Sequence, residues 1–309
     1  MNNNFELIII GGGPAGLMSG IYASRQKIKT LLITEDFGGL VFKKLGKIYN
    51  YLGFPEISGL ELIERFKKHF FSNPIEFLKA RVVSLKKENN IFHIFLQENK
   101  VFFAQSVIIA TGSSPRTLKV PGEKEFLGKG VSYCAACDAP LFKKKSVAVI
   151  GGGNSGCETA LFLSELENEV FLFEREKEIN SEEIIKEKIL ENKRIKIFLN
   201  SQLKEIKGKD FVEAIVFQDL TSKKEEELKV QGVFIEVGAL PSSQLVKDLV
   251  DFNERGEIIV DRLTFQTKTE GLFAVGDVIE GKYKQIITAA GQGAQASLYC
   301  YDYLKKIKN

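Results

Sequence analysis

The sequence contains no tryptophan and, among its 309 residues, only two histidines, His69 and His93, and four cysteines. A catalytic triad or a metal site built on histidine would need one of these two, and neither lies near another candidate catalytic residue in the sequence. Four cysteines in a reducing compartment do not make a disulfide framework. We therefore expect neither histidine-based hydrolysis nor a metal site.

Excess charge of one sign and long apolar runs are also missing. Lys plus Arg number 43 against 40 Asp plus Glu, and the resulting formal charge of +3 is too small to indicate nucleic acid or an anionic membrane as partner. No apolar run approaches the roughly 20 residues of a membrane span. The polar start, Met1–Asn4, leads directly into an apolar segment, so it does not resemble a signal peptide. We expect a cytoplasmic protein of about two domains.

The chain opens with a strand, a glycine turn, a helix and a second strand. Apolar residues 5–10 precede the glycine-rich residues 11–16, and a second apolar run, 30–34, ends at Glu35. Such a turn lets a pyrophosphate approach the backbone at a helix N-terminus, and the acid is placed to accept hydrogen bonds from ribose hydroxyls. The glycine pattern alone is weak, but the flanking strands and the acid favour a dinucleotide site over a structural turn.

The same unit occurs a second time. An apolar strand, residues 146–150, precedes the glycine turn 151–156; a helical stretch, 158–166, and a strand, 169–173, lead to Glu174. Two such units predict two bound dinucleotides, and the simplest use of two dinucleotides is to pass electrons from one to the other.

Turn-rich segments 113–122 and 238–243 flank the second unit and are typical of crossings between domains. If both are crossings, the second unit is inserted into the first. We therefore predict an α/β fold with two Rossmann-like dinucleotide-binding domains. The expected boundaries are 1–117 with 243–309 for the first dinucleotide-binding domain, and 118–242 for the second, which carries a candidate dithiol.

That dithiol is Cys134-Ala135-Ala136-Cys137, followed by Asp138. A Cys-x-x-Cys pair closes a small, easily reduced disulfide, and an adjacent carboxylic acid suits general-acid work on a leaving thiolate. A zinc half-site is the first alternative, but Cys157 and Cys300 are single and distant. Buried inert cysteines are the second, and the adjacent acid argues against them.

Five motifs together resemble the low-molecular-weight, bacterial-type thioredoxin reductases over nearly the whole chain. In chain order they are GGGPAG at Gly11–Gly16, ATGSSPR at Ala110–Arg116, VSYCAACD at Val131–Asp138, GGGNSG at Gly151–Gly156 and FAVGDV at Phe273–Val278. The resemblance implies a flavoprotein oxidoreductase in which the first and last segments bind FAD and the inserted domain binds NADPH. It also implies a homodimer.

The resemblance assigns roles to single residues. Cys137 matches the flavin-proximal cysteine, Cys134 the one that attacks the partner disulfide, and Asp138 the acid. The candidate FAD-binding residues are Gly11, Gly13, Pro14, Ala15, Gly16, Glu35, Gly39, Asn50, Thr111, Gly112, Gly276, Asp277, Lys284 and Gln285. The candidate NAD(P)H-binding residues are Gly151, Gly153, Asn154, Ser155, Glu174 and Arg175. The family usually has arginine at Lys284, so a bidentate contact there is in doubt.

The nicotinamide site departs from the family, which has a His-Arg-Arg cluster for the 2′-phosphate of NADPH. Here the segment reads Phe173-Glu174-Arg175-Glu176-Lys177. Glu174 would accept hydrogen bonds from a free ribose 2′-hydroxyl and repel a phosphate, which favours NADH or weak discrimination. The alternative is a surface pair between Glu174 and Arg175. Some relatives take electrons from ferredoxin, but the intact turn 151–156 counts against that here.

The expected partner is thioredoxin or a thioredoxin-like protein. Lys129 and residues 141–145 flank the dithiol and offer either a basic landing surface or a solvated face. Relatives that serve peroxiredoxins share this core and normally carry an extra N-terminal module; the first unit here begins at residue 5, which leaves no room for one. A non-turnover flavin redox sensor is the alternative from another class.

Overall fold

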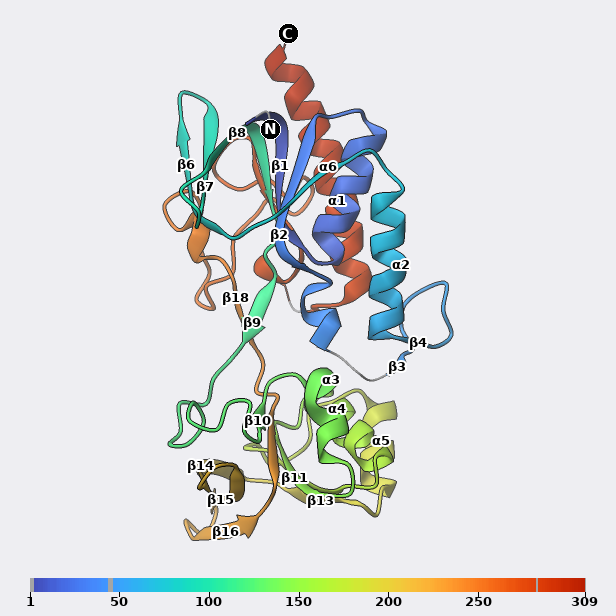
Figure 1. Cartoon of the computed structure of the whole chain (residues 1–309), viewed down its shortest axis with the longest axis vertical. Coiled ribbons are helices and arrows are strands. Elements are labelled where there is room, and N and C mark those ends of the chain that lie inside the picture. Colours follow the sequence, from blue (N-terminus) through green and yellow to red (C-terminus); the bar gives the residue numbers. More distant parts are fainter. Residues whose placement is uncertain (1–2, 44–46, 282, 309) are drawn as a thin grey trace. The chain divides into compact units, whose positions relative to one another are not determined.

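The computed structural model describes residues 3–43, 47–281 and 283–308, and the chain forms two compact units. Unit 1 is built from residues 1–42, 47–114 and 240–309, and unit 2 mainly from 115–239. The chain passes between the units twice. At these two crossings the short strands β9 (Ser113–Pro115) and β18 (Ala239–Pro241) pair with each other (Figure 1).

Unit 1 contains a seven-stranded sheet in the order β5-β2-β1-β8-β7-β6, with β19 paired to the end of β8. Its strands are β1 (Asn4–Gly12), β2 (Thr30–Phe37), β5 (Glu76–Lys79), β6 (Val82–Glu88), β7 (Ile91–Leu96), β8 (Val101–Ile109) and β19 (Leu272–Ala274). Strands β1, β2, β5, β8 and β19 are parallel, and β6 to β8 form an antiparallel meander. The apolar centre of β1, residues 7–10, is buried, as expected for a parallel strand covered on both faces.

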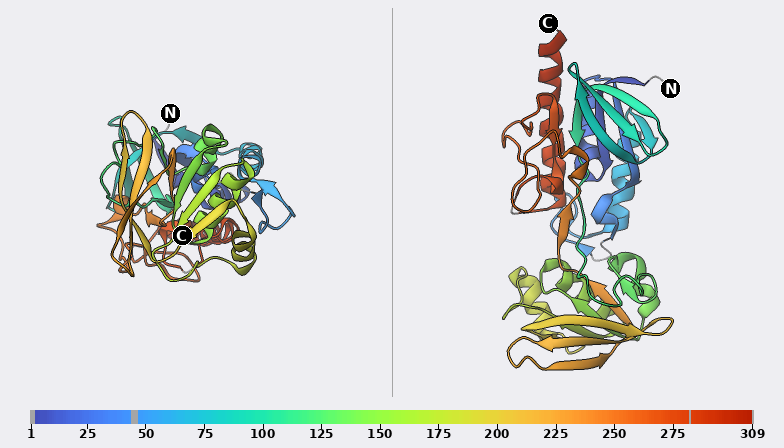
Figure 2. Two further views of the ribbon diagram at one scale, coloured as in Figure 1. Left: turned by 90° about the horizontal axis from the view of Figure 1, so that it is seen from below. Right: turned by 90° about the vertical axis from the view of Figure 1, so that its left-hand side faces the viewer.

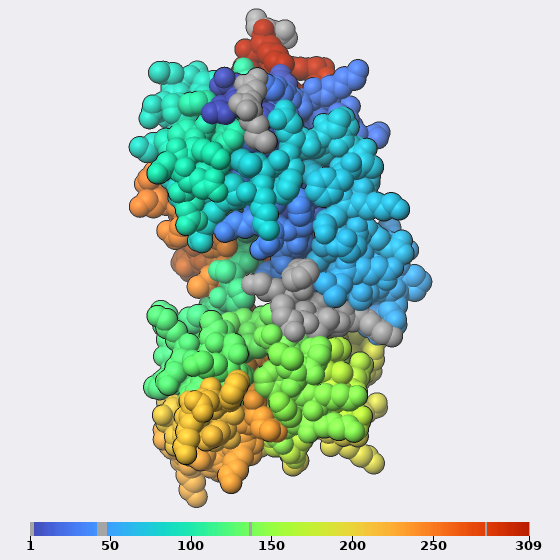
Figure 3. Space-filling view, in the orientation of Figure 1, coloured from blue at the N-terminus to red at the C-terminus, as the bar shows by residue number. Residues whose placement is uncertain are grey.

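The helices of unit 1 are α1 (Pro14–Arg25), α2 (Gly59–Phe71) and α6 (Ile286–Lys308). Short elements complete the unit: η1 (Gly39–Lys43), β3 (Lys47–Ile48), β4 (Ile57–Ser58), η3 (Gln244–Val246) and η4 (Gly276–Val278). Helix α2 is amphipathic: it buries Leu62, Ile63 and Phe70 and presents its other face at the surface shown in Figure 3.

Helices α1 and α6 pack closely, side by side (Figure 1). The hydroxyl of Ser19 donates to the carbonyl oxygens of Ala15 (2.9 Å) and Gly293 (3.0 Å). A Cβ atom at Gly293 would lie 2.1 Å from the Ala15 carbonyl oxygen, so only glycine allows this approach. The C-terminal helix thereby covers the N-terminal nucleotide-type unit, although almost the whole chain separates them in sequence.

Unit 2 has a parallel sheet in the order β10-β17-β11-β12-β13 and a separate antiparallel sheet β14-β15-β16 (Figure 2). The parallel strands are β10 (Val131–Ser132), β11 (Ser146–Ile150), β12 (Glu169–Phe173), β13 (Ile195–Phe198) and β17 (Gly232–Ile235). The antiparallel strands are β14 (Ser201–Gly208), β15 (Val212–Asp219) and β16 (Glu225–Lys229). The helices are α3 (Ala135–Asp138), η2 (Ala139–Phe142), α4 (Asn154–Glu165) and α5 (Glu183–Glu191).

Two hydrophobic clusters lie on opposite faces of the parallel sheet of unit 2. One joins the sheet to the antiparallel layer and includes Phe173 and Phe217; the other joins it to α4 and α5 and includes Val149 and Leu163. Both units therefore have the strand–turn–helix–strand core that the sequence predicts, and the predicted α/β fold class with an inserted second unit is confirmed. Among the described residues, no helix has both the length and the apolar character that crossing a bilayer requires.

Candidate functional site

The first glycine turn joins β1 to α1 and leaves one position open. Gly11 has φ +117°, and a Cβ atom there would lie 2.2 Å from the Ala110 carbonyl oxygen; at Gly16 it would lie 1.9 Å from the Gly11 carbonyl oxygen. At Gly13, the N-cap of α1, a Cβ atom would meet nothing within 4 Å. The outer glycines thus allow internal packing, whereas Gly13 leaves room for a ligand at a helix N-terminus without a side-chain cap.

The second turn, between β11 and α4, repeats this construction. Gly151 has φ +116°, and its Cβ atom would lie 2.4 Å from the Glu236 carbonyl oxygen; the Cβ atom of Gly156 would lie 1.8 Å from the Gly151 carbonyl oxygen. Gly153, again an N-cap without a side-chain hydrogen bond, has its nearest neighbour atom at 4.0 Å. Both turns therefore fit the pyrophosphate of a dinucleotide.

The two acids predicted to contact ribose differ in their surroundings. Glu35, two residues before the end of β2, is exposed and lies 3.9 Å from Arg81 Nε, beside a cavity of about 540 Å³ that both residues line. Glu174 is directed at its own glycine turn: Oε2 accepts a hydrogen bond from Gly152 N (2.5 Å) and Oε1 accepts one from Glu176 N (2.9 Å). Both of its carboxylate oxygens therefore accept backbone hydrogen bonds beside the second glycine turn.

Asn154, the first residue of α4, supports the second turn. Its Oδ1 accepts a hydrogen bond from Glu182 N (2.8 Å), and its Nδ2 donates to Glu182 Oε1 (3.1 Å). The next residue, Ser155, is half-buried, and Arg175, after β12, is exposed. The Asn154 side chain therefore links the start of α4 to the segment before α5 through two hydrogen bonds.

Two pairs of candidate FAD-binding residues lie together although their members are separated in the sequence. Asn50 Nδ2 donates to Gln285 Oε1 at 3.2 Å across 235 positions. The backbone of Gly39 approaches that of Gly13, since a Cβ atom at Gly39 would be 3.6 Å from the Gly13 Cα. Thr111 Oγ1 donates to the carbonyl oxygen of Ser242 (2.7 Å). Beside it, Gly112 has φ +64° with nothing within 4 Å of its Cβ position.

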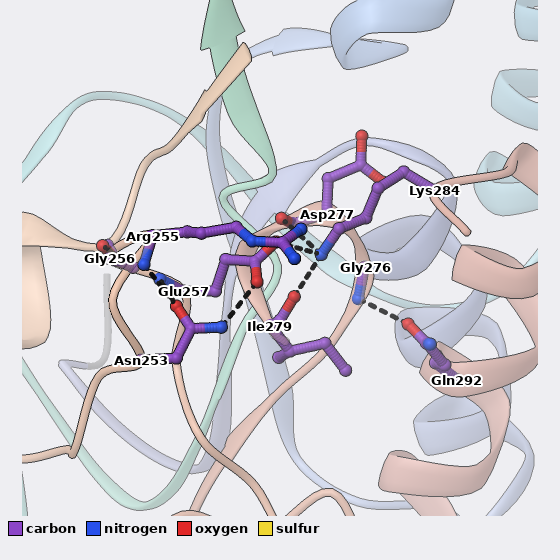
Figure 4. A network of polar contacts seen from close by, with 10 residues as sticks. Asn253, Arg255, Gly256, Glu257, Gly276, Asp277, Ile279, Lys284 and Gln292 are labelled. Carbon is purple, nitrogen blue, oxygen red and sulfur yellow. Dashed lines mark hydrogen bonds and ion pairs between the residues drawn. The ribbon is translucent and has the colours of Figure 1, made fainter. Parts of the chain in front are cut away.

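The loop that carries Asp277 is held from two sides (Figure 4). The N–H of Gly276, at φ +79°, donates to Gln292 Oε1 on α6 at 2.8 Å. The ammonium of Lys284 donates to the Asp277 carbonyl oxygen (3.3 Å) and pairs with Glu257 Oε1 (3.0 Å). Gln292 and Glu257 are absent from the sequence-based candidates because no motif or spacing marks them.

Glu257 gives this loop a testable pH dependence. Burial alone would raise the pKa of Glu257, but hydrogen bonds from Asn253 and Lys284 and nearby positive charge outweigh burial and lower it. A carboxylate with a depressed pKa stabilises the fold above its ordinary value of 4.5, and this contribution is lost as the pH falls through the depressed value. We expect the unfolding free energy of the wild type to fall more steeply below pH 4.5 than that of Glu257→Gln, measured by urea denaturation; parallel curves would contradict this.

The dithiol segment lies between β10 and η2 in unit 2. Cys134 is disulfide-bonded, and the side chain of Cys137 lies outside the described residues. Ser132 Oγ donates to Asp138 Oδ2 (2.6 Å) and accepts a hydrogen bond from Cys134 N (3.0 Å), while Asp138 N donates to the Cys134 carbonyl oxygen (3.2 Å). The buried Ser132 therefore ties the predicted acid to the backbone of the predicted attacking cysteine.

A second group of hydrogen bonds involves Tyr133, the residue after Ser132. The buried carboxylate of Glu123 accepts hydrogen bonds from Leu118 N (2.7 Å), Lys119 N (2.6 Å) and the hydroxyl of Tyr133 (2.5 Å). Burial and the bond to this carboxylate raise the pKa of Tyr133. Sequence reasoning assigned no role to either Ser132 or Glu123. Ser132 lies within the VSYCAACD motif, whereas no motif contains Glu123.

The other two cysteines, Cys157 and Cys300, are buried free thiols. Cys157 lies on α4, with its Sγ 3.6 Å from the Gly152 carbonyl oxygen. Burial raises the pKa of Cys300 to about 12, so at neutral pH this thiol stays protonated and unreactive.

Comparison with known proteins identifies the family. Residues 5–293 match the pyridine nucleotide-disulphide oxidoreductases. An alkyl hydroperoxide reductase subunit of Staphylococcus aureus is 36% identical over 301 residues; the match covers 97% of this chain but 59% of that relative's length. Thioredoxin reductase structures from Lactococcus lactis (TM-score 0.94, 34% identity, 98% of this chain and 99% of that one) and T. acidophilum (0.92, 35%, 99% and 100%) superpose on it. The resemblance to bacterial-type thioredoxin reductases is confirmed, and the chain belongs to the pyridine nucleotide-disulphide oxidoreductase family.

Proposed function

We propose that this chain is a thioredoxin-disulfide reductase that passes electrons from NAD(P)H, through FAD and a Cys134–Cys137 disulfide, to thioredoxin or a thioredoxin-like protein. The family is FAD-dependent and uses NAD(P)H. The observation that carries the proposal is the disulfide-bonded Cys134, which precedes a dinucleotide-type glycine turn in the same unit and is tied through Ser132 to a carboxylate.

In this proposal unit 1 binds FAD. The open position at Gly13, at the start of α1, would bind the pyrophosphate, Glu35 would bind the adenosine ribose, and Asn50 and Gln285 would contact the flavin. Bound FAD would supply the chemistry that links two-electron hydride transfer to the reduction of a disulfide. Unit 2 binds the nicotinamide dinucleotide at Gly153.

The dithiol performs the exchange with the partner. The Cys134 thiolate attacks one sulfur of the partner disulfide, which breaks that S–S bond and forms a mixed disulfide. The Cys137 thiolate then attacks Cys134 Sγ, which closes the Cys134–Cys137 bond and releases the second partner sulfur as a thiolate. In this proposal Asp138 supplies a proton to a leaving thiolate, and Ser132 donates a hydrogen bond to its carboxylate.

We propose NADH, or weak discrimination, for the nicotinamide. Replacing Glu174 by serine is expected to raise the kcat/KM ratio of NADPH over NADH by roughly tenfold, because the variant removes a carboxylate that would repel a 2′-phosphate. Steady-state kinetics with both cofactors measure this ratio. Glu178→Ser is the matched control, since Glu178 is an exposed acid four residues on that pairs with Lys186 (3.9 Å). An unchanged ratio in Glu174→Ser would contradict the assignment.

A second candidate function is supply of electrons to a peroxiredoxin system, and the 36% identity to the alkyl hydroperoxide reductase subunit favours it. Anaerobic, nicotinamide-reduced protein is mixed with oxidised thioredoxin or with a thioredoxin-like module of such a peroxidase system. The proposed function predicts new thiols on thioredoxin; thiols on the module alone would favour the alternative. The resemblance also leads us to propose that the protein is cytoplasmic and forms a homodimer. Analytical ultracentrifugation tests whether it is a dimer.

The docking surface proposed for the partner is the segment around the dithiol. Leu141 is exposed, whereas Lys144 lies 3.7 Å from Glu167 and Lys145 lies over the Phe142 ring at 5.3 Å. Part of the basic run is therefore engaged within unit 2, and the apolar Leu141 with Lys143 and Lys129 would supply most of the contact. Salt-dependent association with thioredoxin would support a charged surface.

A further inference from the structure

Lys284 lies in unit 1, seven residues after Asp277, and its side chain turns back to the loop that carries this acid. Its ammonium contacts the carbonyl oxygens of Asp277 (3.3 Å) and Ile279 and the carboxylate of Glu257 (3.0 Å) (Figure 4). An ammonium has three hydrogens, so these three acceptors use its full donor capacity. In this arrangement Lys284 has no donor left for a phosphate or a flavin oxygen.

The carboxylate opposite Lys284 is itself fixed. Glu257 is 7% exposed; its Oε2 accepts a hydrogen bond from Asn253 Nδ2 (2.7 Å), and its backbone N–H donates to Asn253 Oδ1 (3.0 Å). A buried carboxylate needs a charged partner, because an unpaired buried charge is strongly destabilising. Lys284 supplies that partner, so the ion pair is one link between the turn 253–257 and the Asp277 loop.

Backbone hydrogen bonds join the same two segments. Ile258 N donates to the Val278 carbonyl oxygen (2.9 Å), and Glu280 N donates to the Ile258 carbonyl oxygen (3.0 Å). In addition, Lys284 donates hydrogen bonds to the carbonyl oxygens of Asp277 and Ile279. The side chain of Gln292 accepts a hydrogen bond from the N–H of Gly276. The loop therefore has a defined conformation, and the Lys284–Glu257 ion pair is a charged support of it.

We propose that Lys284 and Glu257 are positioning residues that set the conformation of the Asp277 loop for flavin binding, and that Lys284 is not itself a flavin ligand. This rests on the proposed function in one respect, the assignment of FAD to unit 1. It replaces the expectation from the sequence that Lys284 contacts the cofactor. A single ammonium can serve three converging acceptors, whereas the planar fork of arginine directs its donors differently.

A double-mutant cycle separates a positioning pair from a ligand. Flavin dissociation constants are measured by fluorescence for the wild type, Lys284→Met, Glu257→Gln and the double variant. We expect each single variant to weaken flavin binding by roughly tenfold, as for loss of a buried charged hydrogen bond, and the double variant to be no weaker than Lys284→Met. Additive losses, or a loss in Lys284→Met alone, would make Lys284 a ligand and overturn the proposal.

Two further measurements keep the outcome interpretable. Lys268→Met removes an exposed lysine that pairs with Asp251 at 2.6 Å in the same unit, and it should leave flavin affinity unchanged. If Lys284→Met folds poorly, Glu257→Gln, which keeps the side-chain shape, carries the test. Variants that lower the melting temperature without changing flavin affinity or the flavin absorption spectrum would show a purely structural pair and contradict the proposal. A wild type that binds no FAD would instead contradict the proposed function.

Discussion

Replacing Cys134 by serine is expected to abolish reduction of a protein disulfide, by roughly 1,000-fold or more, because the variant loses its attacking nucleophile. Flavin reduction by the nicotinamide should remain, since Cys134 lies in neither glycine turn. The two activities are measured separately, by stopped-flow bleaching of the flavin and by thioredoxin turnover.

The matched control for this variant is Cys300→Ser, a buried free thiol whose Sγ lies 3.2 Å from Ser106 Oγ. It should keep both activities. A Cys134→Ser protein that still reduces thioredoxin would show that electrons leave by another route. A wild type with a reducible flavin and no disulfide turnover would favour the redox-sensor alternative.

Replacing Gly153 by aspartate is expected to raise the KM for the nicotinamide dinucleotide by roughly 100-fold or more, because bringing two like charges together at a binding site costs several kcal/mol. Gly153 has φ −78° and an open Cβ position, so the backbone accepts a side chain, and aspartate is a favoured N-cap. The new carboxylate would lie where the pyrophosphate is expected at the α4 N-terminus.

Two further variants serve as controls: one separates charge from size, and the other tests the glycine turn of unit 1. Gly153→Asn has nearly the same shape and also caps a helix, but it is neutral, so its KM should rise much less than that of the aspartate variant. Gly13→Asp makes the equivalent change in unit 1 and should impair FAD binding instead. Steady-state kinetics and flavin content measure both effects. An unchanged nicotinamide KM in Gly153→Asp would place the dinucleotide elsewhere.

The elements around the glycine turns could be predicted because their sequence signals are local. The strands at 146–150 and 169–173 have the predicted bounds, since continuous apolar runs end at turn residues. The helix between these two strands is predicted to begin at residue 158, but α4 begins at Asn154. Its first turn contains small and polar residues without apolar periodicity, and the N-cap is a glycine without a capping side chain.

The supports of the site could not be predicted in the same way. The Glu257–Lys284 pair joins residues that are 27 positions apart, and the bond from Gly276 to Gln292 depends on how α6 packs. Neither has a periodic pattern, because both result from tertiary contacts. Asn50 and Gln285 were predicted only from family resemblance, and the structure shows them hydrogen-bonded to each other.

The central claim is that electrons pass from a nicotinamide to a bound flavin and then to the dithiol. Its most direct test is anaerobic bleaching of the flavin by NADH and by NADPH in parallel, followed by titration of the thiols that appear. The account predicts fast bleaching by at least one of them, NADH foremost, and new thiols in the wild type that are absent in Cys134→Ser. Bleaching by dithionite but by neither nicotinamide would contradict it and would move the electron donor to ferredoxin or another protein.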